Sequence, residues 1–389
     1  MSDPVRLDPF ADIRPYRDDE VAEVLARLIR DREFADLLLR MRMPGLARRW
    51  PGLGRRLARL ALARRFRGIS TVAGFQELVG ALLQSHMRRV TTSLEVSGLQ
   101  ALDKSRAYLF IGNHRDIAMD PALVNLMLYE NGFDTVRIAI GDNLLSKGFA
   151  SDLMRINKSF IVRRGMTGRR EKLNALQQLS AYIRASVTEE GCSVWIAQRE
   201  GRAKDGVDAT ETAILKMLAL SRAPGQEFAA ALAELRPVPV AISYEFDPCD
   251  ADKARELHAL RTQGAYHKSE HEDLQSIYRG IAGDKGRVRV AFAAPLAGAD
   301  LASPEAAAAA VDSAILREYR LFATHFAAHA LLFGHDPRAD RLRAELAEPG
   351  WADSERRFQA RLAAVPEAER DLLLAMYANP LRRRLALEA

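Results

Sequence analysis

The sequence predicts an α/β protein: a central sheet flanked by helices, with helical segments at both ends. Short apolar runs alternate with helical stretches between about Leu94 and residue 292, and arginine-rich helical patterns precede them. From Ser303 onward the chain is rich in Ala, Leu, Arg and Glu and has no strand signal. The length of 389 residues is enough for two or three structural units. We therefore expect a basic helical segment at 1–90, an α/β domain at 91–300 and a helical segment at 301–389.

The N-terminal helices are expected from Val21 to about Met87, with breaks at Pro44-Gly45 and Pro51-Gly52. The strands of the sheet are expected at six short apolar runs: 108–111, 136–140, 160–162, 194–197, 238–242 and 288–292. Pro304 marks the start of the closing helical segment.

Composition excludes several classes of protein. Apolar residues make up 48% and charged residues 28%, so wholesale disorder is not expected. The two cysteines, Cys192 and Cys249, lack metal-ligand spacing and indicate reduced, packed thiols, and we expect no metal site. No apolar stretch reaches the ~18 residues of a spanning helix, and the polar start of the chain is unlike a secretory signal. We expect a cytoplasmic protein that is peripheral on the inner face of the membrane.

The basic charge is concentrated near the N-terminus. The net charge is +6, and no acidic residue occurs between Asp36 and Glu77, where ten arginines accumulate. Leu57, Leu60, Ala61 and Phe66 alternate with these arginines at near-helical spacing. Such a basic amphipathic segment is suited to an anionic membrane surface, although a solvated arginine face on an ordinary helix gives the same pattern.

A His and two carboxylates lie between a predicted strand and a predicted helix. Tyr108 to Ile111 predicts a buried strand, and His114 follows in the loop at its carboxyl end, where open α/β sheets bind ligands. Asp120-Pro121 predicts an N-cap followed by Pro at the first helical position. A His beside a carboxylate can act as a general base. Asp120 and Asp116 compete as its partner.

Four blocks of residues occur in a fixed order at the ends of predicted strands. The first holds Asn113-His114 and Asp120-Pro121, and the second is the basic-ended run 158–164. The third, 199–206, is built around Glu-Gly and a following basic residue, and the fourth, 238–244, begins Val-Pro-Val. This order resembles the glycerolipid acyltransferases, the family that includes glycerol-3-phosphate acyltransferase and lysophosphatidate acyltransferase. The resemblance covers roughly residues 90 to 250.

One departure from the family pattern concerns the first block. The family usually places four residues between its His and its Asp, whereas five residues separate His114 from Asp120. Because Asp120 is expected at the start of the helix, the extra residue is expected to lie in the preceding loop. The resemblance favours Asp120 over Asp116 as the partner of His114, since the position of Asp120 before Pro121 matches the family pattern.

The resemblance implies an enzyme that moves a fatty acyl group from an acyl thioester to a hydroxyl of glycerol 3-phosphate or a lysophospholipid. It implies a mixed central sheet and no cofactor beyond the thioester co-substrate, carried on coenzyme A or on acyl carrier protein. His114 would be the general base. The residues expected to contact the substrates, through guanidinium forks, point charges or close backbone approach, are Arg163, Arg164, Glu200, Gly201, Arg202 and Lys204.

Two other functions compete with this interpretation. His114-Arg115-Asp116 matches the start of a protein-kinase catalytic loop, but Pro121 stands where that loop requires Asn. A non-enzymatic basic protein that binds nucleic acid or an anionic membrane surface is the alternative function. Only Trp50 and Phe66 interrupt the arginine-rich segment with aromatic rings, so we expect lipid rather than nucleic acid as the partner.

Overall fold

The computed structural model describes residues 8–145, 147–269 and 272–387. Contacts between Cα atoms divide the chain into two compact units. Unit 1 runs to Leu83 and includes Arg137–Tyr182, and unit 2 takes in Gln84–Val136 and the chain from Ile183 onward. The division of the sequence near residues 90 and 300 stays a prediction.

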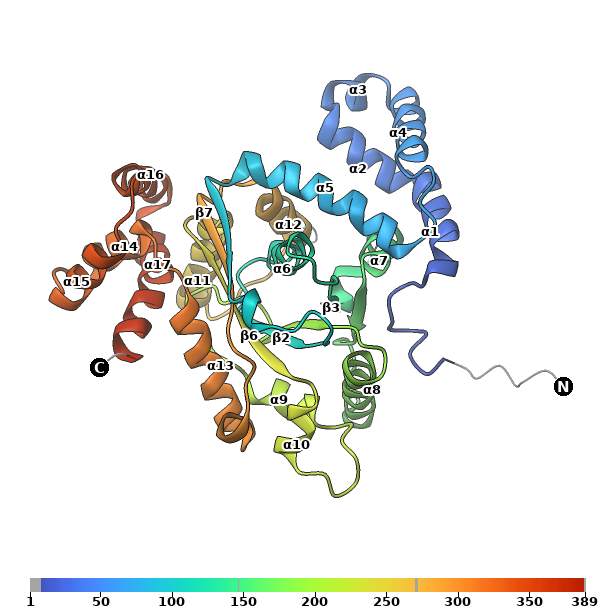
Figure 1. Cartoon of the computed structure of the whole chain (residues 1–389). Coiled ribbons are helices and arrows are strands. Elements are labelled where there is room, and N and C mark those ends of the chain that lie inside the picture. The colour runs from blue at the N-terminus through green and yellow to red at the C-terminus, as the bar shows by residue number, and fades with distance from the viewer. Residues whose placement is uncertain (1–7, 146, 270–271, 388–389) are drawn as a thin grey trace. The chain divides into compact units, whose positions relative to one another are not determined.

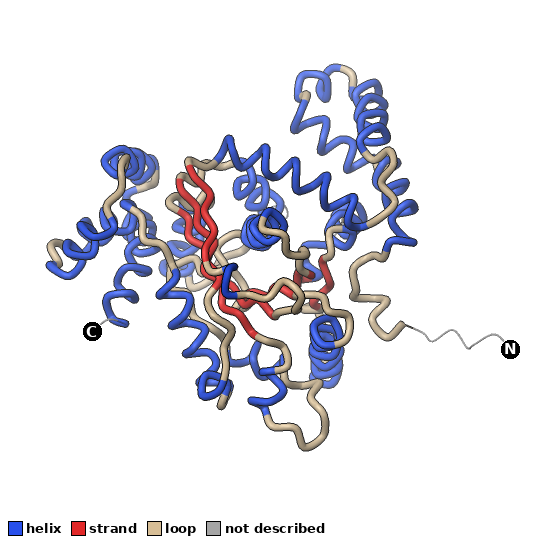
Figure 2. The backbone as a smooth tube through the Cα atoms, viewed as in Figure 1, coloured by secondary structure: helices blue, strands red, loops and turns tan. Residues whose placement is uncertain are grey.

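A seven-stranded mixed sheet confirms the predicted α/β class (Figures 1 and 2). The strand order is β1-β7-β6-β2-β5-β3-β4, and β6 and β7 form the antiparallel pair. The strands are β1 (Ser93–Ser97), β2 (Leu109–Gly112), β3 (Arg137–Gly141), β4 (Ser159–Val162), β5 (Val194–Ala197), β6 (Pro237–Tyr244) and β7 (Arg287–Phe292). The six predicted strands are all present. The sequence interpretation missed β1, because only Leu94 and Val96 are apolar in that short run.

The central strands of unit 2 are buried on both faces. Strands β2 and β6 have every residue buried, as expected for parallel neighbours covered by helices on each side. Helices α6 (Met119–Glu130) and α12 (Glu272–Ala282) lie on one face. Helices α9 (Thr212–Leu218), α10 (Phe228–Ala233) and α13 (Pro304–Glu318) lie on the other (Figure 1). Ser303 caps α13 by accepting a hydrogen bond from the Ala306 amide at 3.0 Å.

The C-terminal helices of unit 2 pack around their own apolar cluster, which includes Phe246, Phe358, Leu373 and Tyr377. These helices are α14 (Ala323–Phe333), α15 (Pro337–Leu346), α16 (Trp351–Ala364) and α17 (Glu367–Leu387), and α11 (Asp250–Gln263) packs against α17. The predicted helical ending is confirmed. It is joined to the α/β part through buried polar groups, which are described below.

Unit 1 contains most of the predicted N-terminal helices: α1 (Asp18–Arg30), α2 (Arg32–Arg42), α3 (Pro44–Arg49), α4 (Pro51–Arg65) and the first part of α5 (Val72–Val90). The predicted breaks are confirmed, because Pro44 and Pro51 each occupy the first position of a new helix. Unit 1 also holds α7 (Gly148–Ile156) and most of α8 (Arg169–Thr188). Its core includes Val24, Leu28, Phe34 and Phe75.

None of the helices in the described ranges combines the length and the apolar character needed to cross a bilayer.

Candidate active site

The loop that carries His114 follows β2 directly, and two close contacts fix its start. Gly112 ends β2, and a Cβ there would lie 2.7 Å from the indole nitrogen of Trp195. Glycine therefore lets the Trp195 ring reach His114, and the two ring centroids are 6.2 Å apart. The Asn113 side chain bonds both main-chain groups of Ile242 on β6, at 2.7 Å to the N–H and 3.0 Å to the carbonyl.

His114 and Asp120 are in direct contact. The Nδ1 of His114 lies 2.9 Å from Oδ2 of Asp120, and the Asp120 side chain is fully buried whereas 16% of the His114 side chain is exposed. A carboxylate at Nδ1 favours the tautomer that carries its proton there and leaves Nε2 as the proton acceptor. The five intervening residues, 115–119, run through the loop into the first position of α6, and this spacing allows the contact.

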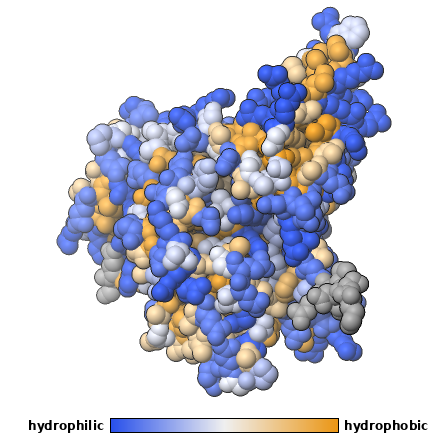
Figure 3. All heavy atoms as spheres, turned by 45° about the vertical axis from the view of Figure 1, so that its right-hand side comes forward, coloured by the Kyte–Doolittle hydropathy of each residue, from blue (hydrophilic) through white to orange (hydrophobic). Residues whose placement is uncertain are grey.

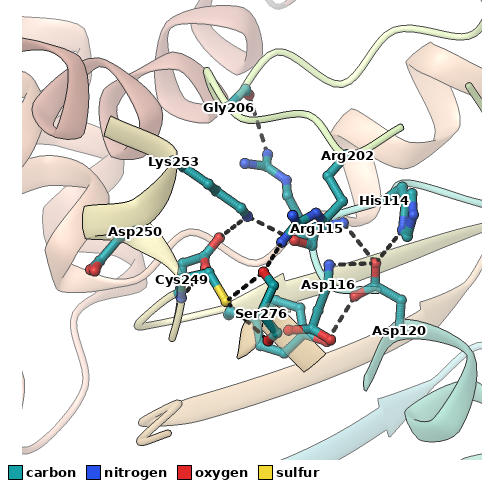
Figure 4. Close-up of polar contacts among 12 residues, drawn as sticks. His114, Arg115, Asp116, Asp120, Arg202, Gly206, Cys249, Asp250, Lys253 and Ser276 are labelled. Carbon is teal, nitrogen blue, oxygen red and sulfur yellow. Dashed lines mark hydrogen bonds and ion pairs between the residues drawn. The ribbon is translucent and has the colours of Figure 1, made fainter. Parts of the chain in front are cut away.

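Asp120 is not the N-cap that the sequence predicted: the N-cap of α6 is Ala118, and Asp116, two residues earlier, accepts the first N–H groups at that helix start. The helix begins at Met119, so Asp120 lies inside its first turn. Asp116 Oδ1 accepts the N–H groups of Ala118 and Met119 at 2.9 and 2.8 Å. Asp120 turns back toward the loop, where its Oδ2 accepts the N–H groups of Arg115 and Asp116 at 2.6 and 2.9 Å. Three donors therefore converge on one oxygen (Figure 4).

The second oxygen of Asp120 has a partner that the sequence interpretation did not assign. The Tyr244 hydroxyl, at the end of β6, donates to Asp120 Oδ1 at 2.8 Å. Burial, and then the charge of Asp120, raise the pKa of Tyr244 well above its ordinary value, so it remains a donor. Tyr244 lay within the fourth block, but nothing local to its sequence indicated this contact.

Asp116 is a second buried carboxylate beside the first. Burial, and then the negative charge of Asp120, raise its pKa above the ordinary value. It also lies against Gly280 of α12, where an added Cβ would come within 2.0 Å of Asp116 Oδ2. Only glycine allows this approach, so α12 packs directly on the candidate catalytic loop.

The third sequence block forms a loop beside His114. The Ala203 N–H donates to the His114 carbonyl at 2.8 Å, which ties the two loops together. Arg202 donates to Ser276 of α12 at 2.8 Å, and no carboxylate within the described residues pairs with it. Lys204 forms an ion pair with Glu256 of α11, so its charge is already neutralised.

The remaining predicted contact residues lie in different environments. The Glu200 N–H donates to Glu211 at 3.3 Å, and Gly201 has φ of +74°, a conformation that favours glycine. Arg163 and Arg164 belong to unit 1. There Arg163 pairs with Asp12, and the Arg164 N–H donates to Asp142 at 3.2 Å.

Two buried cations next to His114 were missed by the sequence interpretation. Arg115 is 5% exposed and pairs with Asp208 at 2.6 Å. Lys253 of α11 is 1% exposed and donates to the Arg115 carbonyl at 2.7 Å. The Lys253 contact joins residues 138 positions apart, and no local pattern indicates it.

Comparison with known proteins finds a similarity over the part of the chain that carries this site. Residues 93–243 match the family model described as Acyltransferase. This stretch contains the His114–Asp120 pair, and Tyr244 follows it directly. It is similar to the acyltransferase family that the sequence blocks indicated.

A solved structure that resembles this chain is the 1-acyl-sn-glycerophosphate (LPA) acyltransferase PlsC from Thermotoga maritima. The two share 14% identity over 74% of this chain and 95% of that chain, with a TM-score of 0.39. The search of curated proteins gave no match.

Proposed function

We propose that this protein transfers a fatty acyl group from an acyl thioester to a hydroxyl of glycerol 3-phosphate or a lysophospholipid, with His114 as the general base. The observation that supports this most is the His114 Nδ1 to Asp120 Oδ2 contact of 2.9 Å inside an acyltransferase domain. Coenzyme A and acyl carrier protein are the two candidate carriers of the thioester.

In the proposed reaction, His114 Nε2 takes the proton of the acceptor hydroxyl while the oxygen attacks the thioester carbonyl. The tetrahedral intermediate collapses, the carbon–sulfur bond breaks, and the imidazolium returns its proton to the leaving thiolate. Asp120 stabilises the imidazolium in between, because its buried carboxylate faces the opposite ring nitrogen. No covalent acyl-enzyme is needed.

The direct test is product analysis with the purified full chain. The acceptors are glycerol 3-phosphate, lysophosphatidate and other lysophospholipids, each offered with acyl-CoA and with acylated carrier protein, and mass spectrometry identifies the product. We expect one acceptor class to yield an ester. Absence of product from every pair would contradict the proposal, and salt-dependent nucleic-acid binding without transfer would support the alternative.

Arg202 is the strongest candidate for the phosphate of the acceptor, because its guanidinium has no carboxylate partner within the described residues. We expect Arg202→Ala to raise the KM for the phosphorylated acceptor about tenfold, with little change in the KM for the thioester. Arg163→Ala should act in the same direction but less strongly, because Arg163 already pairs with Asp12.

The matched control is Lys216→Ala, an exposed cation on α9 that pairs with Glu305. Steady-state kinetics with each substrate varied in turn give the two KM values. A rise confined to the thioester would reassign both arginines to the phosphates of coenzyme A.

Helix α4 is the proposed contact with an anionic membrane. Trp50, Leu53, Leu57 and Leu60 are 63, 52, 44 and 67% exposed, and their spacing places them along one side of the helix. Figure 3 shows hydrophobic residues at the surface of the N-terminal helices. Leu57 and Leu60 were predicted for this surface, whereas Phe66 is half-buried against Phe75.

The arginines of α4 differ in whether they can reach a membrane. Arg55 pairs with Asp36 at 2.8 Å, and Arg59 donates to the Arg30 carbonyl at 2.7 Å. Arg56, Arg64 and Arg65 are exposed. Arginines near an anionic surface contribute about 1 kcal/mol each, so these three carry the expected electrostatic attraction.

We expect the protein to co-float with liposomes that contain anionic lipid and to detach at high salt. Replacing Arg56, Arg64 and Arg65 with Gln should reduce flotation at least about tenfold, since about 3 kcal/mol of attraction is lost. Gln at the exposed Arg338, Arg341 and Arg356 of α15 and α16 is the matched control. Equal flotation of the two variants would leave α4 as an ordinary solvated helix.

A further inference from the structure

A fully buried ammonium contacts the back of the candidate catalytic loop. Lys253 is 1% exposed, forms an ion pair with Asp247 and donates to the Arg115 carbonyl at 2.7 Å (Figure 4). A buried charge is retained only where it is paired, and the ion pair with Asp247 meets that need. The contact with a main-chain carbonyl of the catalytic loop is additional.

The Arg115 carbonyl belongs to the same peptide unit as the N–H of Asp116. That N–H donates to Asp120 Oδ2 at 2.9 Å, the oxygen that also contacts His114 Nδ1. Because a peptide unit is planar, holding its oxygen fixes the direction of its N–H on the opposite edge. A cation at the oxygen also polarises the unit and strengthens the hydrogen bond that the N–H donates.

The C-terminal helices hold Lys253 in place through the turn before α11. The Tyr377 hydroxyl, on α17, accepts the Asp247 N–H at 2.9 Å and donates to Asp250 at 2.9 Å. Arg361, on α16, donates to the Asp247 carbonyl at 2.8 Å and pairs with Asp250. Asp247 is thus fixed at both main-chain groups.

The charge state of this cluster agrees with that role. Burial acts to raise the pKa of Asp247, but the ammonium of Lys253 and its hydrogen bond outweigh burial and hold the pKa below the ordinary value. The Asp247 carboxylate is therefore ionised at neutral pH, and it keeps Lys253 oriented.

We infer that Lys253 is a positioning residue that orients the Arg115–Asp116 peptide toward Asp120, and that α16 and α17 are required to place it. This inference rests on the proposed function of His114 and Asp120. It assigns a role in the reaction to helices that lie outside residues 93–243, the stretch that matches the family model.

The test uses the full chain with Lys253→Met, and with Lys253→Met and Asp247→Asn together so that no unpaired charge is left buried. We expect both variants to lower kcat at least about tenfold while both KM values stay within about twofold. Tyr377→Phe should lower kcat by a smaller factor. Thr324→Val is the matched control, because it removes a buried hydrogen bond of 2.9 Å from α14 to the Glu245 carbonyl.

A second measurement does not depend on turnover. The ring ¹⁵N shifts of His114, assigned with His114→Ala, report its hydrogen bond at Nδ1, and we expect them to change with the paired substitution but not with Thr324→Val. Unchanged kcat and unchanged shifts in the folded paired variant would overturn the inference. If that variant does not fold, Tyr377→Phe decides in the same way. Wild-type protein without transfer activity but with the expected shift change would overturn the proposed function alone.

Discussion

His114→Ala is expected to lower kcat by at least two orders of magnitude while the protein stays folded. General-base catalysis typically contributes ~10² to 10⁴ in rate. The variant lacks the imidazole that contacts Asp120 and can accept a proton from the acceptor. The fold should tolerate the change, since the ring is partly exposed and the main-chain bond from Ala203 to residue 114 is retained. Initial rates of ester formation at saturating substrate measure the effect.

The control for this loss is His86→Ala. His86 is also half-buried and makes one hydrogen bond, 2.7 Å to the Ile281 carbonyl, but it has no carboxylate partner among the described residues. Its replacement should leave kcat within about twofold. Near-normal turnover by folded His114→Ala would refute the general-base mechanism.

Asp120→Asn should have the second-largest effect, a loss of about tenfold to a hundredfold in kcat. An asparagine can direct its oxygen to the loop N–H groups and its amide to the Tyr244 oxygen, so the geometry is retained. What is lost is the negative charge that stabilises the imidazolium of His114. The measurement is kcat, compared with that of Asp116→Asn.

Asp116→Asn should lower kcat by less than about tenfold, because the asparagine oxygen can accept the same N–H groups of Ala118 and Met119. It should also raise the thermal midpoint at neutral pH. The pKa of Asp116 is raised in the folded state, so its ionisation opposes folding as the pH rises above the unfolded value near 3.9. The gain in stability should therefore vanish on acidification below that value. A larger loss of activity at Asp116 than at Asp120 would reverse the assignment of the pair.

The sequence allowed prediction of those parts of the site that are local in the chain. An apolar run followed by a polar loop predicts β2 and places His114 at the carboxyl end of that strand. This prediction does not depend on how distant parts of the chain pack. The N-cap was assigned wrongly to Asp120, because an Asp followed by Pro is a typical helix start, whereas the helix begins one residue earlier, at Met119. The position of the Asp120 side chain depends instead on the Arg115 and Asp116 N–H groups, which donate to it from the loop.

Contacts between distant residues could not be predicted in this way. Nothing near Lys204 indicates that Glu256 neutralises it, and nothing near Lys253 indicates that its ammonium reaches Arg115. Both depend on how α11 packs, which is decided by tertiary contacts with α17. The residues that orient His114 and Asp120 relative to each other therefore could not be predicted from sequence patterns.

The pairing of β1 with β7 has a consequence for where this protein can be cut. Among the strands in the described ranges, β1 pairs with β7 alone, and β7 also pairs with β6, in the antiparallel direction. Strand β7 begins at Arg287, well beyond residue 243. A fragment ending at residue 243 would leave β1 without a partner and would expose a long, apolar edge of β6. Such an exposed edge can pair with another chain, so we expect this fragment to aggregate. The region recognisable by family resemblance is thus shorter than the piece of chain that can fold, which must extend at least through Phe292.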